Sequence, residues 1–298
     1  MRFVEAGGVR VSAIGLGTWQ FGSMEWGYGG RYASDDARAI VHRALDLGVN
    51  LVDTAEVYGQ GRSERIVGEA IRDRRERVFI ATKLFPFGLP LQVASRARAS
   101  ARRLGVQHID LYQQHWPSPL FPAGATMPRM RRLVESGLVG HVGVSNFSLR
   151  QWHDAERALG GPVLSNQVLF NLVHSHPDRD LVPWAQREGR IVIAYSPLGQ
   201  GLLSGRYQDA PPRNFRRFRS NFRTAGRARV GPVVQALNEI ASKHGATPSQ
   251  VALAWLIRKP NVVAIPGASS VHQVDENVAA ADLELANDEA EHLDRLSL

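Results

Sequence analysis

Short apolar runs, rich in β-branched residues, recur along the chain, and most end in a polar residue. Continuous runs of this kind are typical of parallel strands that are buried on both faces. Most of their ends lie about 30 residues apart, which matches the length of one β/α unit in a barrel. The eight predicted strands cover residues 13–16, 49–53, 78–83, 109–112, 142–145, 163–167, 191–195 and 262–265.

Segments with helical periodicity lie between these runs. In residues 35–47 the apolar side chains recur at i, i+3 and i+4, and Gly48 follows where a left-handed C-cap is favoured. Ser34 and Ser63 precede two such segments and are candidate N-caps.

The interval between the last two strands is much longer than the others. It holds a segment at about 199–229 without clear periodicity, followed by helical segments at 230–244 and 249–259. We therefore predict an α/β fold, a single (β/α)8 TIM-type barrel over residues 1–298, with a long rim insertion after strand 7.

A doubly wound dinucleotide-binding fold is the alternative for alternating strands and helices. Its glycine fingerprint is absent, since residues 199–204 carry Ser204 at the third glycine position. A Tyr-x-x-x-Lys pair is also absent, because the residues four before the three lysines are Phe79, Glu239 and Trp255. The barrel is the more economical interpretation.

Composition narrows the cellular setting. The 298 residues are 44% hydrophobic and 21% charged, as in ordinary globular proteins, and include no cysteine. Disulfides, thiolate metal sites and a cysteine nucleophile are therefore excluded. No signal-peptide segment or apolar run of membrane-spanning length is visible, so we expect a cytoplasmic protein without a membrane partner. The oligomeric state is left open.

The net charge of +8 comes almost entirely from arginine, since only three lysines are present. Segment 206–229 is densest in arginine, and its arginines alternate with phenylalanines, a combination that can bind single-stranded nucleic acid. In a barrel this segment lies at the active-site rim, so we favour a lid that contacts an anionic cofactor over a solvated loop, and we expect no nucleic-acid partner. The residues concerned are Arg213, Arg216, Arg217, Arg219, Arg223, Arg227 and Arg229 with Phe215, Phe218 and Phe222.

Four chemically active residues follow three of the predicted strands. Asp53, Lys83 and His115 end strands, and Tyr58 lies in the loop after Asp53. Each alone fits a structural role, but carboxyl ends of barrel strands converge on one rim. A tyrosine becomes an effective acid when a cation stabilises its phenolate, and a carboxylate keeps that cation charged and oriented. A histidine can hydrogen-bond the substrate oxygen, so together they suit carbonyl reduction.

The sequence around these residues resembles the aldo-keto reductase family. The matching motifs are Asp53–Gly59 with Ser63-Glu64, Gln114-His115-Trp116, Gly143–Phe147 and Ala194–Gly199, and the resemblance covers essentially the whole chain. It implies NADP(H)-dependent reduction of an aldehyde or ketone to an alcohol. In that reaction Tyr58 would be the general acid, Lys83 and Asp53 would tune it, and His115 would orient the carbonyl.

The resemblance also implies a cofactor site. Ser145, Asn146 and Gln167 would hold the nicotinamide carboxamide, Tyr195 would stack on its ring, and residues 196–201 would bind the pyrophosphate. Residues 265–270 resemble the segment for the adenosine end. The full set of expected cofactor residues is Thr18, Trp19, Asp53, Ser145, Asn146, Gln167, Tyr195, Ser196, Pro197, Leu198, Gln200, Gly201, Gly267, Ser269, Gln273 and Asn277.

The adenosine segment departs from the family pattern. Many relatives carry an arginine or lysine here for the 2′-phosphate of NADP(H), whereas this chain has Ser269 and Ser270. Ser270 with Gln273 also fits a helix capping box that needs no ligand. We favour NADP(H) on the habit of the family and leave NAD(H) open.

Other possibilities remain at the level of sequence. Potassium-channel β-subunits resemble this family, so a cofactor-sensing regulatory subunit is the alternative function. Trp19, Trp26 and Trp116 fit either an aromatic substrate pocket or packing of the rim, and the carbonyl substrate is left open. The histidines of His174-Ser175-His176 lack the spacing of metal ligands, so we expect no metal site.

Overall fold

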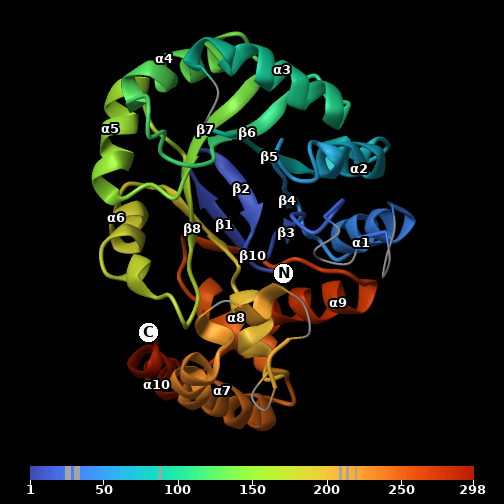
Figure 1. The fold of residues 1–298 in the computed structure, drawn as a ribbon, viewed down its shortest axis with the longest axis vertical. Helices are drawn as coiled ribbons and strands as arrows, with labels where there is room; N and C mark the ends of the chain where they lie inside the picture. The colour runs from blue at the N-terminus through green and yellow to red at the C-terminus, as the bar shows by residue number, and fades with distance from the viewer. Residues whose placement is uncertain (24–27, 30–33, 87–88, 208–209, 213–214, 219) are drawn as a thin grey trace.

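The computed structural model describes residues 1–23, 28–29, 34–86, 89–207, 210–212, 215–218 and 220–298. Eight parallel strands stand in sequence order from β3 to β10, with helices around them (Figure 1). Parallel bridges between Ile14 and Ala264 and between Gly17 and Gly267 join the first and last strands. The strands are β3 (Leu16–Gly17), β4 (Leu51–Asp53), β5 (Phe79–Leu84), β6 (Ile109–Gln114), β7 (Val139–Ser145), β8 (Ser165–Leu169), β9 (Ile191–Tyr195) and β10 (Val262–Ile265).

The predicted barrel is confirmed, because each predicted strand lies in it or at its edge. The apolar faces of the helices pack against these strands and form one core. The helices are α1 (Ser34–Asp46), α2 (Arg62–Ile71), α3 (Val93–Leu104), α4 (Ala123–Glu135), α5 (Leu149–Leu159), α6 (Leu181–Arg187), α7 (Thr224–His244), α8 (Pro248–Ile257), α9 (Val271–Ala279) and α10 (Asn287–Leu296).

The segment between β9 and α8 differs from its prediction. Helix α7 begins at Thr224, so the predicted end of the insertion at 229 is wrong, and the remaining part is shorter. Its described residues form the 3₁₀ turns η5 (Gly199–Ser204), η6 (Phe215–Phe218) and η7 (Ser220–Phe222). Pro232 lies inside α7.

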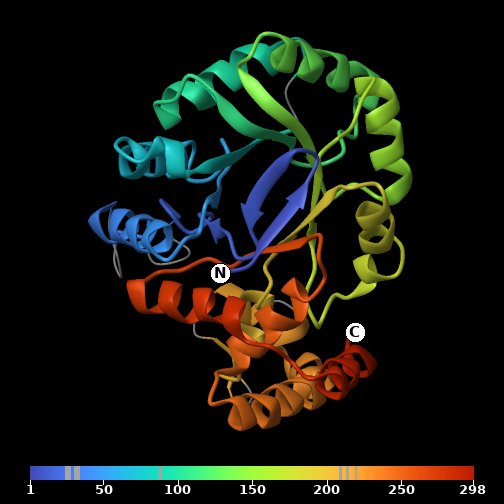
Figure 2. The same ribbon diagram turned by 180° about the vertical axis from the view of Figure 1, so that it is seen from behind.

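An N-terminal hairpin, missed in the sequence, covers the amino ends of the barrel strands (Figure 2). It consists of β1 (Phe3–Ala6) and β2 (Val9–Ser12). Gly7 has a φ of 58°, and a Cβ on it would lie 2.4 Å from Leu164 Cδ1, so this turn requires glycine. The Gly7-Gly8 pair is the sequence signal for such a turn.

Two of the three predicted helix-end residues behave differently from expectation. Gly48 is left-handed, with a φ of 86°, as predicted. Ser34 is the first residue of α1 rather than the residue before it. The N-cap prediction for Ser63 is wrong, because α2 follows Gly61 and the Ser63 hydroxyl donates to Thr18 O at 2.9 Å instead.

Candidate active site

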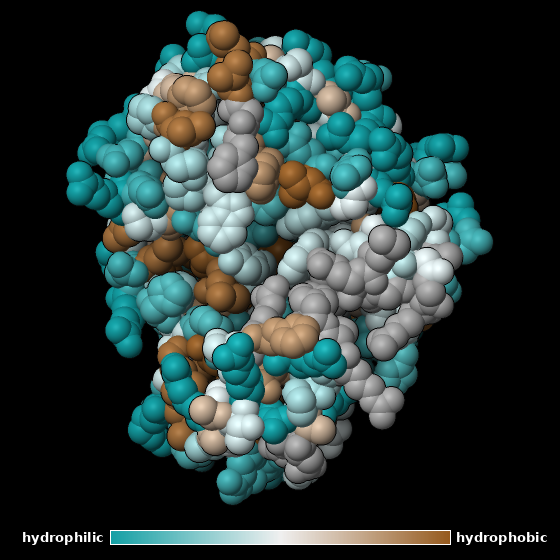
Figure 3. Space-filling model, viewed as in Figure 1, coloured by the Kyte–Doolittle hydropathy of each residue, from teal (hydrophilic) through white to brown (hydrophobic). Residues whose placement is uncertain are grey.

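A cleft of about 980 Å³ opens at the carboxyl ends of the strands. Figure 3, drawn from the side of Figure 1, shows this face hollowed near its middle, with apolar side chains beside the hollow. The cleft is lined by all sixteen residues expected at the cofactor, together with Tyr58 and His115. Lys83 does not line the cleft, because it is fully buried beneath the residues that do. Lining residues outside the predicted cofactor set include Gln20, Leu169, Ser204, Ser249 and Glu276, and Arg206 and Tyr207 line the cleft from the arginine-rich segment 206–229.

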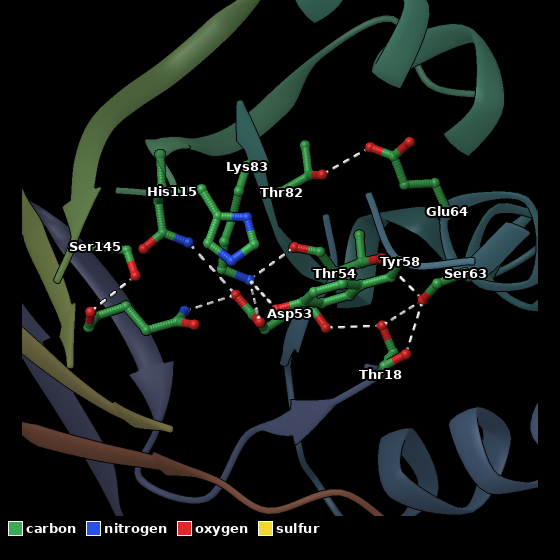
Figure 4. Close-up of polar contacts among 12 residues, drawn as sticks. Thr18, Asp53, Thr54, Tyr58, Ser63, Glu64, Thr82, Lys83, His115 and Ser145 are labelled. Carbon is green, nitrogen blue, oxygen red and sulfur yellow. Dashed lines mark hydrogen bonds and ion pairs between the residues drawn. The ribbon is translucent and has the colours of Figure 1, made fainter. Parts of the chain in front are cut away.

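Lys83 is the centre of the hydrogen-bonded network at the floor of this cleft (Figure 4). Its Nζ donates to Asp53 Oδ1 at 2.5 Å and to Thr54 O at 2.8 Å, and it lies 3.4 Å from Tyr58 Oη. An ammonium group has three N–H donors. All three therefore have an acceptor, and one points to the Tyr58 hydroxyl.

The second oxygen of Asp53 accepts from two buried amides. Gln167 Nε2 donates to Asp53 Oδ2 at 2.8 Å, and Gln113 Nε2 lies 3.4 Å from the same atom. Gln113 was not among the predicted site residues. The available signal was its position two residues before His115, on a strand whose side chains alternate between the two faces.

Three buried hydroxyl groups hold the loop that carries Tyr58. Thr54 Oγ1 donates to Ser63 Oγ at 2.9 Å, and the Ser63 and Thr18 hydroxyls are 2.8 Å apart. Thr18 Oγ1 also donates to Asp53 O at 2.8 Å. These bonds connect β3, the end of β4 and α2. They therefore hold Thr54 O in the position where it accepts a hydrogen bond from Lys83 Nζ (Figure 4).

Tyr58 and His115 face each other in the cleft. Their ring centroids are 5.8 Å apart, and the rings are nearly perpendicular at 78°. The edge of Phe85 contacts His115, with centroids 5.9 Å apart, and Trp19 lies 6.4 Å from Tyr58. Trp116 also lines the cleft, whereas Trp26 lies outside the described residues.

Electrostatics keep both Lys83 and Tyr58 protonated at neutral pH. Burial lowers the pKa of Lys83, but the charges and hydrogen bonds of Asp53 and Tyr58 together raise it more, so the net pKa is above its ordinary value. Burial raises the pKa of Tyr58, and the Lys83 charge only partly offsets this. The expected lowering by Lys83 is therefore present, but burial outweighs it. Tyr58 holds its proton until a stronger base forms beside it.

His115 is neutral in this environment. Burial and the nearby Lys83 charge lower the pKa of His115 to about 3. A neutral imidazole has one N–H donor and carries no extra proton to give away near neutral pH. His115 can therefore orient an oxygen by a hydrogen bond.

A second network connects His115 to the expected nicotinamide site. Asn146 Nδ2 donates to His115 O at 3.2 Å, and Tyr195 Oη donates to Asn146 Oδ1 at 2.9 Å. Ser145 Oγ donates to Gln167 O at 2.9 Å. Burial raises the pKa of Tyr195 to about 12, so this hydroxyl stays protonated.

At the other end of the cleft, the predicted capping box is only half present. Ser270 Oγ accepts from Gln273 N at 3.3 Å. The side chain of Gln273 turns instead to Ser269, accepting from its N at 2.8 Å and from its Oγ at 3.1 Å. This bond fixes the loop before α9, where Asn277 Nδ2 also lies 3.4 Å from Gly267 O.

Arg206 is the one lysine or arginine that lines the cleft within the described parts of the chain. Of the arginine-rich segment, Arg217 packs over the Phe218 ring, and Arg227 and Arg229 belong to α7. Arg213, Arg219 and the side chain of Arg216 lie outside the described residues. The predicted lid therefore stays a prediction.

The described side chains contain no group of three or more His, Cys, Asp or Glu residues that could hold a metal ion. No helix in the described ranges is long and apolar enough to cross a membrane.

The fold and the site together define a class: a β/α-barrel enzyme with a buried Lys–Asp pair beneath a tyrosine. The family model "Aldo/keto reductase family" matches residues 13–298, so the chain belongs to the aldo/keto reductase family and is an NAD(P)H-dependent oxidoreductase.

Individual relatives agree with this assignment. An uncharacterised oxidoreductase of Mycobacterium tuberculosis is 55% identical over 96% of this chain and 90% of that protein. Methylglyoxal reductase YeaE of Escherichia coli is 35% identical over 97% of this chain and 92% of that protein. An aldo-keto reductase of Klebsiella pneumoniae in complex with NADPH is 31% identical, with a TM-score of 0.81 over 100% of this chain and 96% of that one.

Proposed function

We propose that this protein reduces aldehydes or ketones to alcohols with NADPH, and that Tyr58 donates the proton. The observation that carries the proposal is the position of Tyr58 Oη, which is 3.4 Å from Lys83 Nζ at the floor of the cleft. His115, with a pKa of about 3, stands opposite as a neutral hydrogen-bond donor.

The residues fit a proton-transfer role in the following way. Bound NADPH supplies the hydride that adds to the carbonyl carbon. His115 holds the carbonyl oxygen by a hydrogen bond and directs it toward Tyr58. The Tyr58 hydroxyl then gives its proton to the developing alkoxide, and the phenolate that remains is stabilised by the Lys83 ammonium. Asp53 keeps that ammonium charged and aimed at Tyr58.

The cleft suits a nicotinamide dinucleotide in size and in its donor set. About 980 Å³ lies at the upper end of the range for small-molecule sites. A carboxamide has both donors and acceptors, and the hydroxyl and amides of Ser145, Asn146 and Gln167 provide the complementary groups. Tyr195 offers an aromatic face beside them, so these residues would hold the nicotinamide end.

The phosphate end relies on Arg206 and on loop backbone. Apart from His272, Asp275 and Glu276, residues 196–201 and 267–277 contribute uncharged side chains, so Arg206 is the described arginine or lysine available to the phosphates. NADP(H) is supported over NAD(H) because the Klebsiella pneumoniae relative binds NADPH. The methylglyoxal reductase relative suggests small reactive aldehydes as first substrates to try.

The test is NADPH and NADH oxidation by the wild-type protein over a panel of aldehydes and ketones that includes methylglyoxal. Turnover with NADPH in preference to NADH supports the proposal, and turnover with NADH in preference to NADPH contradicts its cofactor. Tight NADPH binding without turnover of any carbonyl would favour a cofactor-sensing regulatory subunit instead. No nucleotide binding would refute both.

A further inference from the structure

The Asp53 carboxylate accepts hydrogen bonds from more donors than its pairing with Lys83 requires. Its Oδ1 is occupied by Lys83 Nζ at 2.5 Å, while Oδ2 faces Gln167 Nε2 at 2.8 Å and Gln113 Nε2 at 3.4 Å. The two amides differ in access. Gln167 lines the cleft, whereas Gln113 has no exposed surface and does not line it.

The position of Gln113 is fixed by the strands. In the register of β5 and β6, Gln113 pairs with Lys83, so the two side chains lie side by side and point into the barrel. On its other side Gln113 pairs with Gly143, where a Cβ would approach Gln113 Cγ to 2.9 Å. The glycine therefore leaves room for the amide.

The Gln113 side chain lowers the stability of the folded state. Its Oε1 is sealed, with no hydrogen-bond partner in the described structure, and the same holds for the nearby Ser165 Oγ, which lies against Gly143. A buried acceptor without a partner destabilises the folded state, and an apolar side chain of the same size would avoid that cost. The amide at this position is thus better explained by its contact with Asp53 than by stability.

We propose that Gln113 is a positioning residue that keeps the Asp53 carboxylate oriented when Gln167 turns from Asp53 to the nicotinamide. This inference rests on the proposed function. In the structure Gln167 donates to Asp53, yet it also lines the cofactor cleft, so cofactor binding competes for its amide. Gln113 cannot reach the cleft and stays with Asp53, which in turn holds Lys83 against Tyr58.

The test replaces Gln113 by methionine, which has a similar length and no donor. We expect kcat for carbonyl reduction to fall about tenfold, the scale for a lost hydrogen bond to a charged group. The Kd for NADPH and the KM for the carbonyl should stay close to wild type. The melting temperature should change little, because the bond lost to Asp53 is offset by the removal of an unpaired buried acceptor. Gln113→Leu serves as a second variant if the first does not fold.

Asn261→Leu is the matched control for the loss of a buried amide. Asn261 donates to Val182 O and Arg190 O just before β10, at the end of the barrel away from the cleft. This variant should melt at a lower temperature with unchanged kcat. A lower melting temperature with unchanged kcat in Gln113→Met as well would show a structural role and overturn the inference.

A double variant tests whether Gln167 loses its hydrogen bond to Asp53 when the cofactor binds. If it does, Gln113→Met costs about tenfold in kcat in both the wild-type and the Gln167→Met backgrounds, because Gln113 is then the amide that donates to Asp53 Oδ2 while Lys83 occupies Oδ1. If Gln113→Met costs little alone and tenfold only with Gln167→Met, Gln167 keeps its bond and the inference fails. Absence of carbonyl reduction by the wild type would instead refute the proposed function itself.

Discussion

The two ends of the cleft contrast in how their polar groups are held. At the end formed by β4, β5 and β6, the side chains of Lys83 and Asp53 are buried. The pairing of these strands places their hydrogen-bond partners beside them. At the other end, residues 196–207 and 267–277 form loops and a helix start, with Arg206 exposed.

This difference follows from what each end has to do. Proton transfer needs fixed distances and little water, since an ion pair is stronger and a hydrogen bond more directional in a dry site. Binding and release of a large anionic molecule need access and charge, which partly exposed loops can provide. We therefore expect substitutions at the sealed end to affect kcat and stability, and substitutions at the open end to affect cofactor affinity.

The largest effect is expected for Lys83→Met. It leaves Asp53 charged and buried without its partner, which should lower the free energy of unfolding by about 3–5 kcal/mol. It also removes the cation beside Tyr58, so kcat should fall about 10³-fold. Denaturant unfolding and NADPH oxidation measure the two effects.

The control for that substitution is Lys259→Met, which removes a lysine paired with Asp178 at 3.1 Å and close to the Trp255 ring. Its loss should cost about 1 kcal/mol of stability and leave kcat unchanged. A similar loss of kcat in both lysine variants would show that the effect of Lys83→Met is not specific to the buried site.

At the open end, Arg206→Met should raise the Kd for NADPH about tenfold, because a charge-assisted bond to phosphate is lost. The kcat at saturating NADPH should stay unchanged. Fluorescence titration at low and high salt measures the affinity and its screening. Arg217→Met, which alters an arginine that does not line the cleft, is the control, and an equal effect there would assign the affinity to overall charge instead.

The pH dependence should be nearly flat over the neutral range. Reduction needs protonated Tyr58, and burial raises the pKa of Tyr58 above its ordinary value, so kcat should fall only above about pH 10. His115, with a pKa of about 3, contributes no change between about pH 6 and pH 9. A steady-state profile of kcat checks this, and a fall between about pH 6 and pH 8 would show that a group near the histidine value donates the proton.

The smallest effect is expected for Ser270→Ala, which removes the N-cap of α9. Stability should fall by about 1 kcal/mol, as for other capping hydroxyls, and the Kd for NADPH should stay near wild type. Thr247→Ala, at the start of α8, should behave alike in thermal unfolding. A rise in Kd confined to Ser270→Ala would mean that the start of α9 binds the cofactor directly.

The same contrast explains how far the sequence could be interpreted. The eight strands were predictable because buried parallel strands need continuous apolar runs, and the residues after them had to meet at one rim. Asp53, Lys83, Tyr58 and His115 followed from that rule. The start of α7 was not predictable, because Pro232 and the surrounding arginines conceal its periodicity, and the hairpin of β1 and β2 was too short to stand out.

Side-chain contacts that depend on three-dimensional proximity were also beyond the sequence. Gln113 and Gln167 share one oxygen of Asp53 although 54 residues separate them in the chain. Burial of Tyr58 outweighs the effect of Lys83 on its pKa, and only the surrounding atoms determine that balance. The Gln273 side chain accepts a hydrogen bond from Ser269 N rather than from Ser270 N, and local geometry alone determines which of the two bonds forms.

We propose that Tyr58 gives its proton to the reduced carbonyl, and single-turnover kinetics of Tyr58→Phe are the decisive measurement of this role. The NADPH complex of each protein is mixed rapidly with an aldehyde that the wild type reduces, and the loss of nicotinamide absorbance is followed. If Tyr58 is the proton donor, Tyr58→Phe should bind NADPH as the wild type does, and its rate of hydride transfer should be lowered at least about 10²-fold. A rate within a few-fold of wild type would contradict it and assign the proton to another group.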